Sequence, residues 1–406
     1  MAGPRPSTAR KPGRLRALGS CVLEIGYRHH HRWAMPVTPA GPSAEVVRSS
    51  LVKVLFFQHA ANEFMSQLAE TLGAAGITTA FVCFSETPDS GHGVTPAAEP
   101  YFLPMKSRLN PAALFRLRRL IDRFQPNIIY CSTALACFNS IIAQFPKKSS
   151  KLVFYRGAIR RPNWISPSDL LIFKSRWVDM FHCACSAVAN SLCRAGVSPE
   201  KLFVFPAIGY SISQFSPQPL PANLEKRNAR HRIGAVANYR KVKGLEYLVD
   251  ALELLTCRGL DVELVIVGAD KSHTLAQYVS KSPVASRVVL AGPIVPAWPV
   301  IRTFDCLTLP SLREGLNKTV IEAFACDVPV VATNVGGTPD VVIHGRNGLL
   351  VQPGNSAQLA DAIEKVLTDV RLATKFKVEG KRVFQEKFEV SVVSSKYVEL
   401  FRSVTT

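Results

Sequence analysis

Two successive series of strand-like apolar runs, separated by a proline-rich stretch, constrain the fold of this chain most. In the first series, LVKVLFF (51–57), ITTAFVCF (77–84) and NIIYCS (127–132) alternate with segments of helical periodicity. In the second series, IGAVAN (233–238) and VELVIVG (262–268) do the same. Continuous apolar runs that alternate with helices are typical of parallel strands buried on both faces. The sequence therefore predicts an α/β protein with two doubly wound, Rossmann-like domains.

The predicted domain boundaries follow the composition. A length of 406 residues favours two domains of ordinary size, and SPQPLPANLEKRNARHR (216–232) reads as a linker because it is first proline-rich and then charged. Ligands of doubly wound sheets bind beyond the carboxyl ends of the strands, so two facing domains would enclose a site. We predict a leader at 1–50, an amino-terminal domain at 51–216, a linker at 217–232, a carboxy-terminal domain at 233–385 and a final helix at 386–406 that crosses back to the first domain.

The first 50 residues are basic, with eight Lys or Arg and two Glu. Gly19, Glu24 and Gly26 interrupt what would be the apolar core of a signal peptide. The leader could be an organelle transit peptide, a flexible tail, or the product of an upstream start codon with Met35 as the true start; the last two are favoured. The chain has no run of apolar residues long enough to predict a membrane span.

The formal net charge of +19 indicates anionic partners, although it could also describe a solubilising surface. Nucleic acid is not expected, because the basic residues are not interleaved with stacking aromatics. The helical segment 110–124 carries Arg116, Arg119 and Arg123, which favours an anionic membrane surface; the alternative is an ordinary sheet-covering helix. Ten cysteines without a C-x-x-C pair predict reduced thiols, and hence a cytoplasmic protein. The net charge and the Arg-rich helical segment add the hypothesis that it could attach peripherally to the inner face of the membrane.

The stretch from 310 to 326 carries the chemistry. A buried strand ends at Pro310, a loop with Glu314, Gly315, Leu316 and Asn317 follows, and a helix begins near Lys318. Amides at a helix N-terminus suit phosphate or sugar oxygens, and a glycine lets a ligand approach the backbone closely. Glu314 could accept hydrogen bonds from sugar hydroxyls and Glu322 from a ribose diol. The two carboxylates could equally complement the helix dipole and occupy a solvated face.

The surrounding residues carry a resemblance. PSLREGLNKTVIEAFACDVPVVATNVGG (310–337), followed by GRNGLLVQPGN (345–355), resembles the donor-site signature of glycosyltransferase family 4 (glycosyl transferases group 1), whose members are retaining GT-B enzymes. The resemblance covers 230–355, with Asp327 where the family usually has glycine. It implies the GT-B fold, a catalytic role for Glu314, and a donor site formed by Glu322, Gly315, Leu316 and Asn317.

A second element, ANYRKVKGLEYLVDAL (237–252), resembles the family's pyrophosphate-binding segment. Arg240 and Lys243 are the matching cations, and fixed cations would stabilise the charge that develops on a departing nucleoside diphosphate. We therefore count both among the catalytic residues. The commoner family spacing places the arginine where Asn238 stands, so either position could reach the phosphate.

The amino-terminal half departs further from the family. The loop HAANEF (59–64) lacks the family's glycine pair, and the strand NIIYCS lacks its histidine. The acceptor-side candidates that remain are His59 and Arg156, with Gly157 and His182 as further positions. Each histidine could instead be structural, and Arg156 could pair with a buried carboxylate.

The sequence has no Asp-x-Asp triplet, so we expect no essential metal. We expect no other cofactor either, since the nucleotide-sugar donor is a substrate. The resemblance thus implies a metal-independent retaining glycosyltransferase of the hexosyltransferase type, with UDP-sugars favoured as donors. Its acceptor would be a sugar, a lipid-linked sugar or a small molecule, as in cell-surface polysaccharide or glycolipid synthesis. The alternatives are a sugar-nucleotide epimerase or phosphorylase of the same fold and a non-catalytic sugar-nucleotide-binding protein. The sequence leaves open the donor sugar and base, the acceptor and the oligomeric state.

Overall fold

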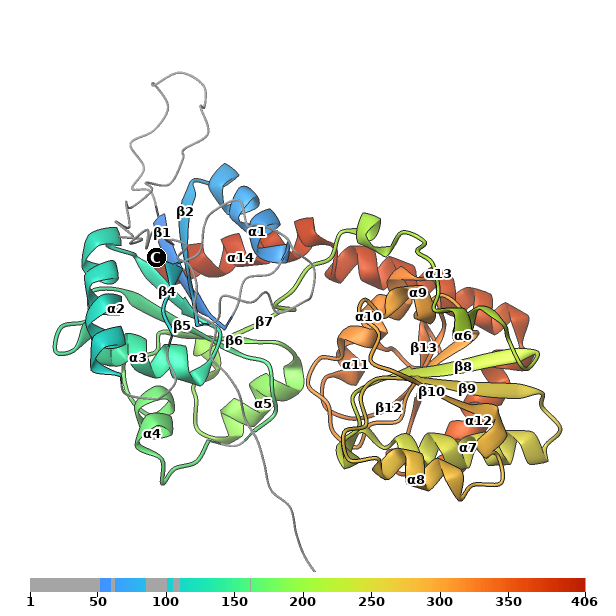
Figure 1. Ribbon diagram of the computed structural model, residues 1–406. Helices are drawn as coiled ribbons and strands as arrows, with labels where there is room; N and C mark the ends of the chain where they lie inside the picture. Colours follow the sequence, from blue (N-terminus) through green and yellow to red (C-terminus); the bar gives the residue numbers. More distant parts are fainter. Residues whose placement is uncertain (1–51, 60–62, 85–100, 105–109, 161, 406) are drawn as a thin grey trace, which may run out of the picture. The chain divides into compact units, whose positions relative to one another are not determined.

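A computed structural model describes residues 52–59, 63–84, 101–104, 110–160 and 162–405, which form two parallel sheets with helices on both faces (Figure 1). The predicted leader at 1–50 lies outside the described residues, as do positions 60–62 of the loop after the first strand. Every strand pair within the two sheets is parallel, which confirms the predicted fold class.

The first sheet has seven strands in the order β3-β2-β1-β4-β5-β6-β7. Its strands are β1 (Val52–Gln58), β2 (Ile77–Cys83), β3 (Tyr101–Phe102), β4 (Ile128–Cys131), β5 (Lys151–Arg156), β6 (Met180–Cys183) and β7 (Leu202–Val204). Apolar side chains on one face pack under α2 (Pro111–Phe124), α3 (Ala134–Gln144), α4 (Pro167–Phe173) and α5 (Ser186–Arg194). The other face packs under α1 (Glu63–Ala74) and α14 (Val390–Thr405).

The second sheet has six strands in the order β10-β9-β8-β11-β12-β13. Its strands are β8 (His231–Val236), β9 (Val262–Val267), β10 (Val288–Gly292), β11 (Cys306–Leu309), β12 (Val330–Thr333) and β13 (Gly348–Val351). One face is covered by α7 (Leu245–Cys257), α8 (Thr274–Ser280) and α12 (Ser356–Thr368). The opposite face is covered by α9 (Trp298–Ile301), α10 (Lys318–Ala325), α11 (Thr338–Val341) and α13 (Val370–Lys387).

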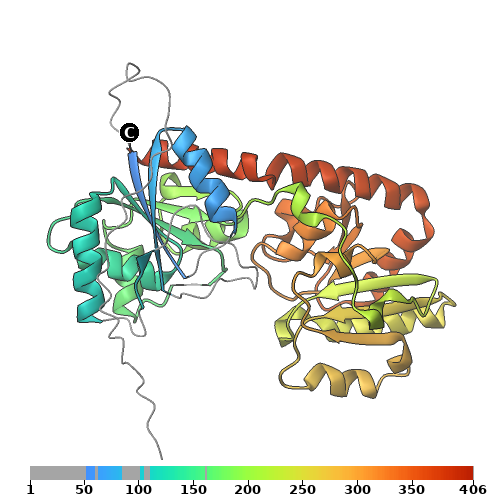
Figure 2. The ribbon, with the colours of Figure 1, turned by 45° about the horizontal axis from the view of Figure 1, so that its top comes forward.

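The carboxyl terminus completes the first domain, as the sequence predicts. Helix α14 follows α13 and lies beside α1 (Figure 2). The Tyr397 hydroxyl donates to the carbonyl oxygen of Ala207 over 2.9 Å and lies 3.2 Å from the hydroxyl of Tyr130 on β4. The crossing helix begins at Val390, whereas the predicted boundary at 385/386 falls inside α13.

The predicted linker at 217–232 ends inside a strand. It contains the short helix α6 (Ala222–Glu225), and β8 already begins at His231. Of the two residues misplaced by this boundary, His231 and Arg232, Arg232 is charged yet only 2% exposed. The charged residues of this stretch predicted an exposed segment. The guanidinium of Arg232 is instead buried, where it joins the linker to the second sheet.

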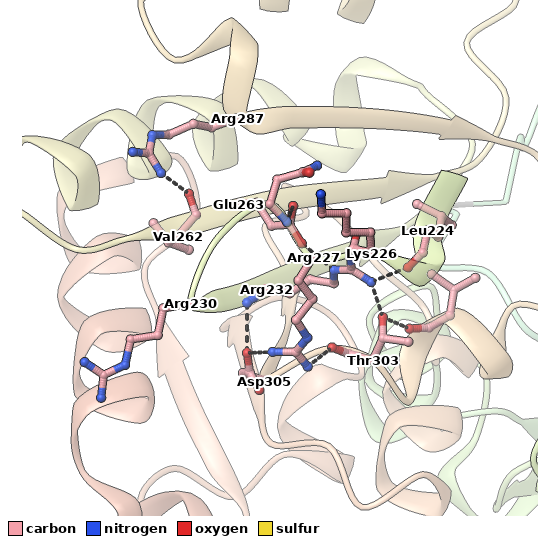
Figure 3. Close-up of polar contacts among 12 residues, drawn as sticks. Leu224, Lys226, Arg227, Arg230, Arg232, Val262, Glu263, Arg287, Thr303 and Asp305 are labelled. Atoms are coloured by element: carbon pink, nitrogen blue, oxygen red, sulfur yellow. Dashed lines mark hydrogen bonds and ion pairs between the residues drawn. The ribbon is translucent and has the colours of Figure 1, made fainter. Parts of the chain in front are cut away.

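Arg232 makes that attachment with all of its side-chain nitrogens (Figure 3). Its Nε donates to Oε1 of Glu263 over 2.6 Å, and its two Nη atoms donate to the carbonyl oxygens of Leu224 and Lys226, each over 2.8 Å. The amide of Asn228 donates to the second oxygen of Glu263 over 3.0 Å. One buried ion pair therefore fixes the last residues of the linker to strands β8 and β9.

The backbone conformation at Asp327 accounts for the glycine that glycosyltransferase family 4 usually has at this position. It follows the end of α10 with a φ of 58°, in the left-handed region that glycine adopts without steric cost. Its carboxylate lies 3.0 Å from Nζ of Lys381 on α13. The departure from the family pattern thus leaves the helix ending in place.

The described cysteines are all free, and eight of the nine are buried or half-buried. In the part of the chain that the structure covers, no helix combines the length and the apolar character needed to cross a membrane.

Candidate functional site

Glu314 lies in the loop between β11 and α10, and one of its carboxylate oxygens accepts three hydrogen bonds. Oε1 accepts from Nζ of Lys243 over 2.5 Å, from Oγ of Ser311 over 2.8 Å and from Nδ2 of Asn317 over 3.1 Å. The Lys243 and Glu314 side chains are 13% and 9% exposed, so this ion pair is only weakly screened by solvent. The second carboxylate oxygen receives no hydrogen bond from the described residues. Protein contacts thus hold Glu314 by one oxygen and leave the other for a ligand.

Helix α10 begins where the sequence predicts, and Asn317 is the reason. Its Oδ1 accepts from the amide of Thr319 over 2.8 Å, which caps the helix. Because its Nδ2 also donates to Glu314, both polar atoms of the Asn317 side chain already contact the protein. The amides of Gly315 and Leu316, by contrast, donate to no group in the described residues. Free amides beside a helix N-terminus can bind an anion or a sugar oxygen.

Glu322 lies one turn inside α10, and no described side chain donates a hydrogen bond to its carboxylate. The side chain keeps some exposure, yet enough protein surrounds it that burial raises its pKa to about 7, against the opposing effect of Lys318. A desolvated carboxylate without a hydrogen-bond donor lowers the stability of the fold. Such groups are typical of ligand-binding sites.

Arg240 and Asn238, the two candidates for the phosphate-binding position, differ in the contacts that their side chains already make. The carboxamide oxygen of Asn238 accepts from the amide of Ala269 over 2.9 Å and is therefore occupied. Arg240 precedes the short 3₁₀ turn Lys241–Lys243, is exposed, and makes no side-chain ion pair with the described residues. Since Lys243 is matched by Glu314, Arg240 and the neighbouring Lys241 are the cations of this segment that form no ion pair with the described residues.

Two close backbone approaches fix the segments around Glu314. Gly244 has a φ of 61°, and a Cβ there would lie 2.3 Å from the carbonyl oxygen of Pro310. A Cβ on Gly336 would collide with the carbonyl oxygen of Glu314 itself. The amide of Gly337 also donates to the carbonyl oxygen of Gly315 over 3.1 Å. Glycine is required at these contacts because any side chain would displace the loop.

The first domain also reaches this loop. A Cβ on Gly315 would lie 2.4 Å from the carbonyl oxygen of Gly157, which follows β5. The amide of Ser186, at the start of α5, donates to Oδ2 of Asp340 on α11 over 2.5 Å. The carboxyl ends of β5 and β6 therefore contact the donor-side segments, as expected for ligand sites of parallel sheets.

The acceptor-side candidates have different surroundings. His59 is exposed directly after β1, and its side chain makes no polar contact with the described residues. Arg156 ends β5 and is half-buried. His182 is wrong as a site residue because it is completely buried: its ring nitrogens lie 2.8 Å from the Tyr130 hydroxyl and 2.9 Å from the Phe205 carbonyl oxygen. Burial lowers its pKa to about 3, so it stays neutral.

Ser311 and Thr333 are positioning residues that motif reasoning did not single out. Ser311 is completely buried and donates to Glu314, while the Thr333 hydroxyl donates to the carbonyl oxygens of Leu309 and Ser311. Both residues belong to the sequence 310–337 that carries the family resemblance, and this membership is the signal by which they could have been found. In the described ranges, no cluster of three or more His, Cys, Asp or Glu could hold a metal ion.

Sequence comparisons match both halves of the chain to known families. Residues 61–207 match the profile "Glycosyltransferase Family 4", and residues 230–369 match "Glycosyl transferases group 1". The chain is 24% identical to the capsular polysaccharide biosynthesis glycosyltransferase CapM of Staphylococcus aureus over 327 residues, which covers 75% of this chain and 84% of CapM. It is 35% identical to the D-inositol 3-phosphate glycosyltransferase of Pseudarthrobacter chlorophenolicus over 139 residues, about a third of each chain.

Solved structures share the fold at low sequence identity. A glycosyltransferase from Rickettsia africae superposes with a TM-score of 0.72 at 17% identity, covering 88% of this chain and 99% of that one. HepE of Anabaena, solved in complex with UDP-glucose, superposes with a TM-score of 0.68 at 20% identity, covering 87% of this chain and all of HepE.

Proposed function

Because this chain is a glycosyltransferase of the GT-B fold, with a Glycosyltransferase Family 4 domain and a glycosyl transferases group 1 domain, we propose that it transfers a sugar from a UDP-linked donor with retention of the anomeric configuration. The acceptor is a sugar or a lipid-linked sugar in the synthesis of a cell-surface polysaccharide or glycolipid. The observation that carries this proposal is the loop before α10, where free amides and the open oxygen of Glu314 lie together. CapM and the UDP-glucose complex of HepE support the choice of donor and pathway class.

The residues suggest a division of labour during transfer. Glu322 accepts hydrogen bonds from the ribose diol, and the amides of Gly315 and Leu316 bind oxygens of the donor. Arg240 neutralises the charge that develops on the departing diphosphate, with Lys243 beside it. The open oxygen of Glu314 faces the transferring sugar, where its charge stabilises positive charge on the ring. No side chain is assigned the role of a nucleophile, so retention comes from attack on the face that the diphosphate leaves.

A donor panel tests this function. Wild-type protein is incubated with radiolabelled UDP-, GDP- and ADP-sugars in the absence of an acceptor. Of the three classes, we expect only the UDP-sugars to be hydrolysed slowly. We also expect only these to raise the melting temperature, since a ligand at 100 times its Kd stabilises the fold by about 2.7 kcal/mol. With a competent acceptor, NMR should show a retained linkage, and turnover should survive excess EDTA. An inverted product or full loss of turnover on chelation would refute the mechanism.

Glu322→Gln is expected to weaken UDP-sugar binding by about ten- to a hundredfold, because charge-assisted hydrogen bonds worth roughly 1.5–3 kcal/mol are lost. The pH dependence has a defined sign. The carboxyl pKa is about 7 in the folded protein, against 4.5 ordinarily, so this group stabilises the fold most below pH 4.5 and that contribution is lost as the pH rises through 7.

The Gln variant should therefore melt at a higher temperature than wild type at about pH 8, where the buried carboxylate is ionised, while it binds donor less well. Donor affinity of wild type should fall as the pH drops below 7, and that of the variant should not. Calorimetric titration and thermal melts at both pH values measure these effects. A variant that binds donor like wild type would assign Glu322 a purely structural role.

We further propose that the first domain attaches to an anionic membrane surface through α2. Phe115 is 58% exposed in the middle of this helix, and the Arg119 guanidinium lies 4.9 Å from its ring centroid. Arg118 donates to the carbonyl oxygen of Phe145, a second exposed aromatic residue. Exposed aromatics flanked by arginines suit an interface at which apolar chains meet anionic headgroups.

Co-sedimentation with vesicles tests the attachment. Binding to phosphatidylglycerol vesicles at low salt should fall at high salt, because each basic residue contributes roughly 1 kcal/mol near an anionic surface. A variant with Gln at Arg116, Arg119 and Arg123 should bind far less, whereas Gln at Arg371, an exposed arginine of α13, should change little. Absence of binding to anionic vesicles at low salt would end this proposal.

A further inference from the structure

Strand β5 ends in Arg156, which forms no ion pair with any carboxylate of the described residues. The Nη2 atom of Arg156 donates to the carbonyl oxygen of Arg160 over 2.8 Å, and its guanidinium lies 5.6 Å from the ring centroid of Phe173. Its Nε is buried and finds no acceptor among the residues that the structure describes. A buried donor without an acceptor costs folding free energy, so its retention here needs an explanation.

The charges around Arg156 do not supply a partner. Asp169 acts on it electrostatically, but Oδ2 of Asp169 accepts from the amide of Asn163 over 2.7 Å, and no ion pair joins it to Arg156. Arg160 is exposed and adds a second positive charge beside the first. The end of β5 therefore presents two guanidinium groups with an unfilled capacity for an anion.

The same segment runs past the donor loop. The carbonyl oxygen of Gly157 lies 2.4 Å from where a Cβ of Gly315 would stand. The Cδ1 atom of Ile159 lies 3.1 Å from the corresponding position on Gly336, and Gly336 packs directly against the backbone of Glu314. A molecule bound at Arg156 would thus lie one to three residues from Gly157 and Ile159, which pack against the loop of Glu314.

Exposed apolar side chains accompany these cations. Ile159 is 39% exposed, Trp164 is 40% exposed and Ile165 is 91% exposed. The Nζ of Lys174 lies 5.0 Å from the ring centroid of Trp164, which adds a further positive charge. Ile159, which precedes the exposed Arg160, and Trp164, whose ring lies under Lys174, favour a ligand that is both apolar and negatively charged.

We propose that Arg156 and Arg160 bind a phosphate group of the acceptor, and that the apolar chain linked to this phosphate lies against Ile159, Trp164 and Ile165. Planar guanidinium groups match phosphate geometry and remain charged when half-buried. This rests on the proposed function, because it specifies the acceptor of the same transfer reaction. It selects a lipid-linked sugar phosphate among the acceptors considered and excludes a neutral sugar.

Binding of simple amphiphiles tests the site without knowledge of the natural acceptor. Wild-type protein is saturated with UDP, so that the donor's phosphate positions are filled, and titrated calorimetrically with monomeric decyl phosphate, decyl glucoside and butyl phosphate. We expect decyl phosphate to bind at least tenfold more tightly than the neutral glucoside and than the short-chain phosphate. The first comparison isolates the charge and the second isolates the apolar chain.

Arg156→Gln and Arg160→Gln should each weaken decyl phosphate binding by about tenfold or more, since a charge-assisted hydrogen bond is lost. Arg156→Lys should bind with intermediate affinity and covers the case that the Gln variant does not fold. Arg176→Gln is the matched control, because Arg176 is an exposed arginine outside the segment after β5. Equal binding by the Arg156 variants and the control, or tight binding of decyl glucoside, would overturn the proposal.

Failure of this site and failure of the proposed function give different results. Slow hydrolysis of UDP-sugar by the wild-type protein reports the donor reaction and needs no acceptor. Hydrolysis without arginine-dependent binding of decyl phosphate would reject the phosphate site alone. Arginine-dependent binding without UDP-sugar hydrolysis would reject the transfer reaction and leave the anion site standing.

Discussion

Replacement of Lys243 by methionine is expected to lower kcat for sugar transfer by about a hundred- to a thousandfold, the effect of removing one fixed electrostatic donor from a catalytic site. The side chain is 13% exposed and lies 2.5 Å from Oε1 of Glu314. Methionine keeps the volume of the side chain but removes the positive charge that we propose to lie beside the departing diphosphate. It also frees Glu314 from its only described cationic partner, so the carboxylate loses part of its fixed orientation.

The measurement separates these two consequences. Steady-state kinetics give kcat and donor KM, and thermal melts give stability, for Lys243→Met, for Glu314→Gln and for the double variant. We expect the double variant to regain stability, because no unpaired buried charge remains, without regaining turnover. Lys241→Met, an exposed lysine of the same 3₁₀ turn, is the matched control. A kcat for Lys243→Met within threefold of wild type would contradict a catalytic role.

Replacement of Arg232 by methionine is expected to destabilise the protein by about 3–5 kcal/mol, the usual cost of leaving a buried charge without its partner. Both side chains of the Arg232–Glu263 pair are 2% exposed, and the distance between Nε and Oε1 is 2.6 Å. The variant also leaves the carbonyl oxygens of Leu224 and Lys226 without a donor. Urea unfolding, followed by circular dichroism, measures the change in the free energy of unfolding.

Two comparisons locate the cause. Arg227→Met removes the neighbouring pair with Asp305, whose side chains are 39% and 34% exposed, and should cost about 1 kcal/mol or less. Replacing Arg232 and Glu263 together should recover part of the loss, because the unpaired carboxylate is removed. A loss below 1 kcal/mol for Arg232→Met would mean that the linker is held mainly by apolar contacts such as that of Leu224.

Local sequence determined much of the second domain. The apolar runs gave β8, β9 and β11 because parallel strands buried on both faces carry few polar residues. Asn317 placed the start of α10, because its side chain caps the helix two residues on. Pro111 and Asn110 did the same for α2 in the first domain. Such signals act within a few residues and therefore can be predicted from the sequence.

Contacts between distant residues were decided only by the tertiary structure. Lys243 meets Glu314 across 71 positions, and the pairing determines which oxygen of Glu314 stays open. Tyr397 reaches Tyr130 across 267 positions, so the last helix completes the first domain and buries His182, which sequence reasoning had placed near the site. That no described carboxylate forms an ion pair with Arg156 is equally a tertiary fact. The sequence determined which chemical groups are available, whereas burial and pairing, which depend on the packing of remote segments, decided which of them are free to bind a ligand.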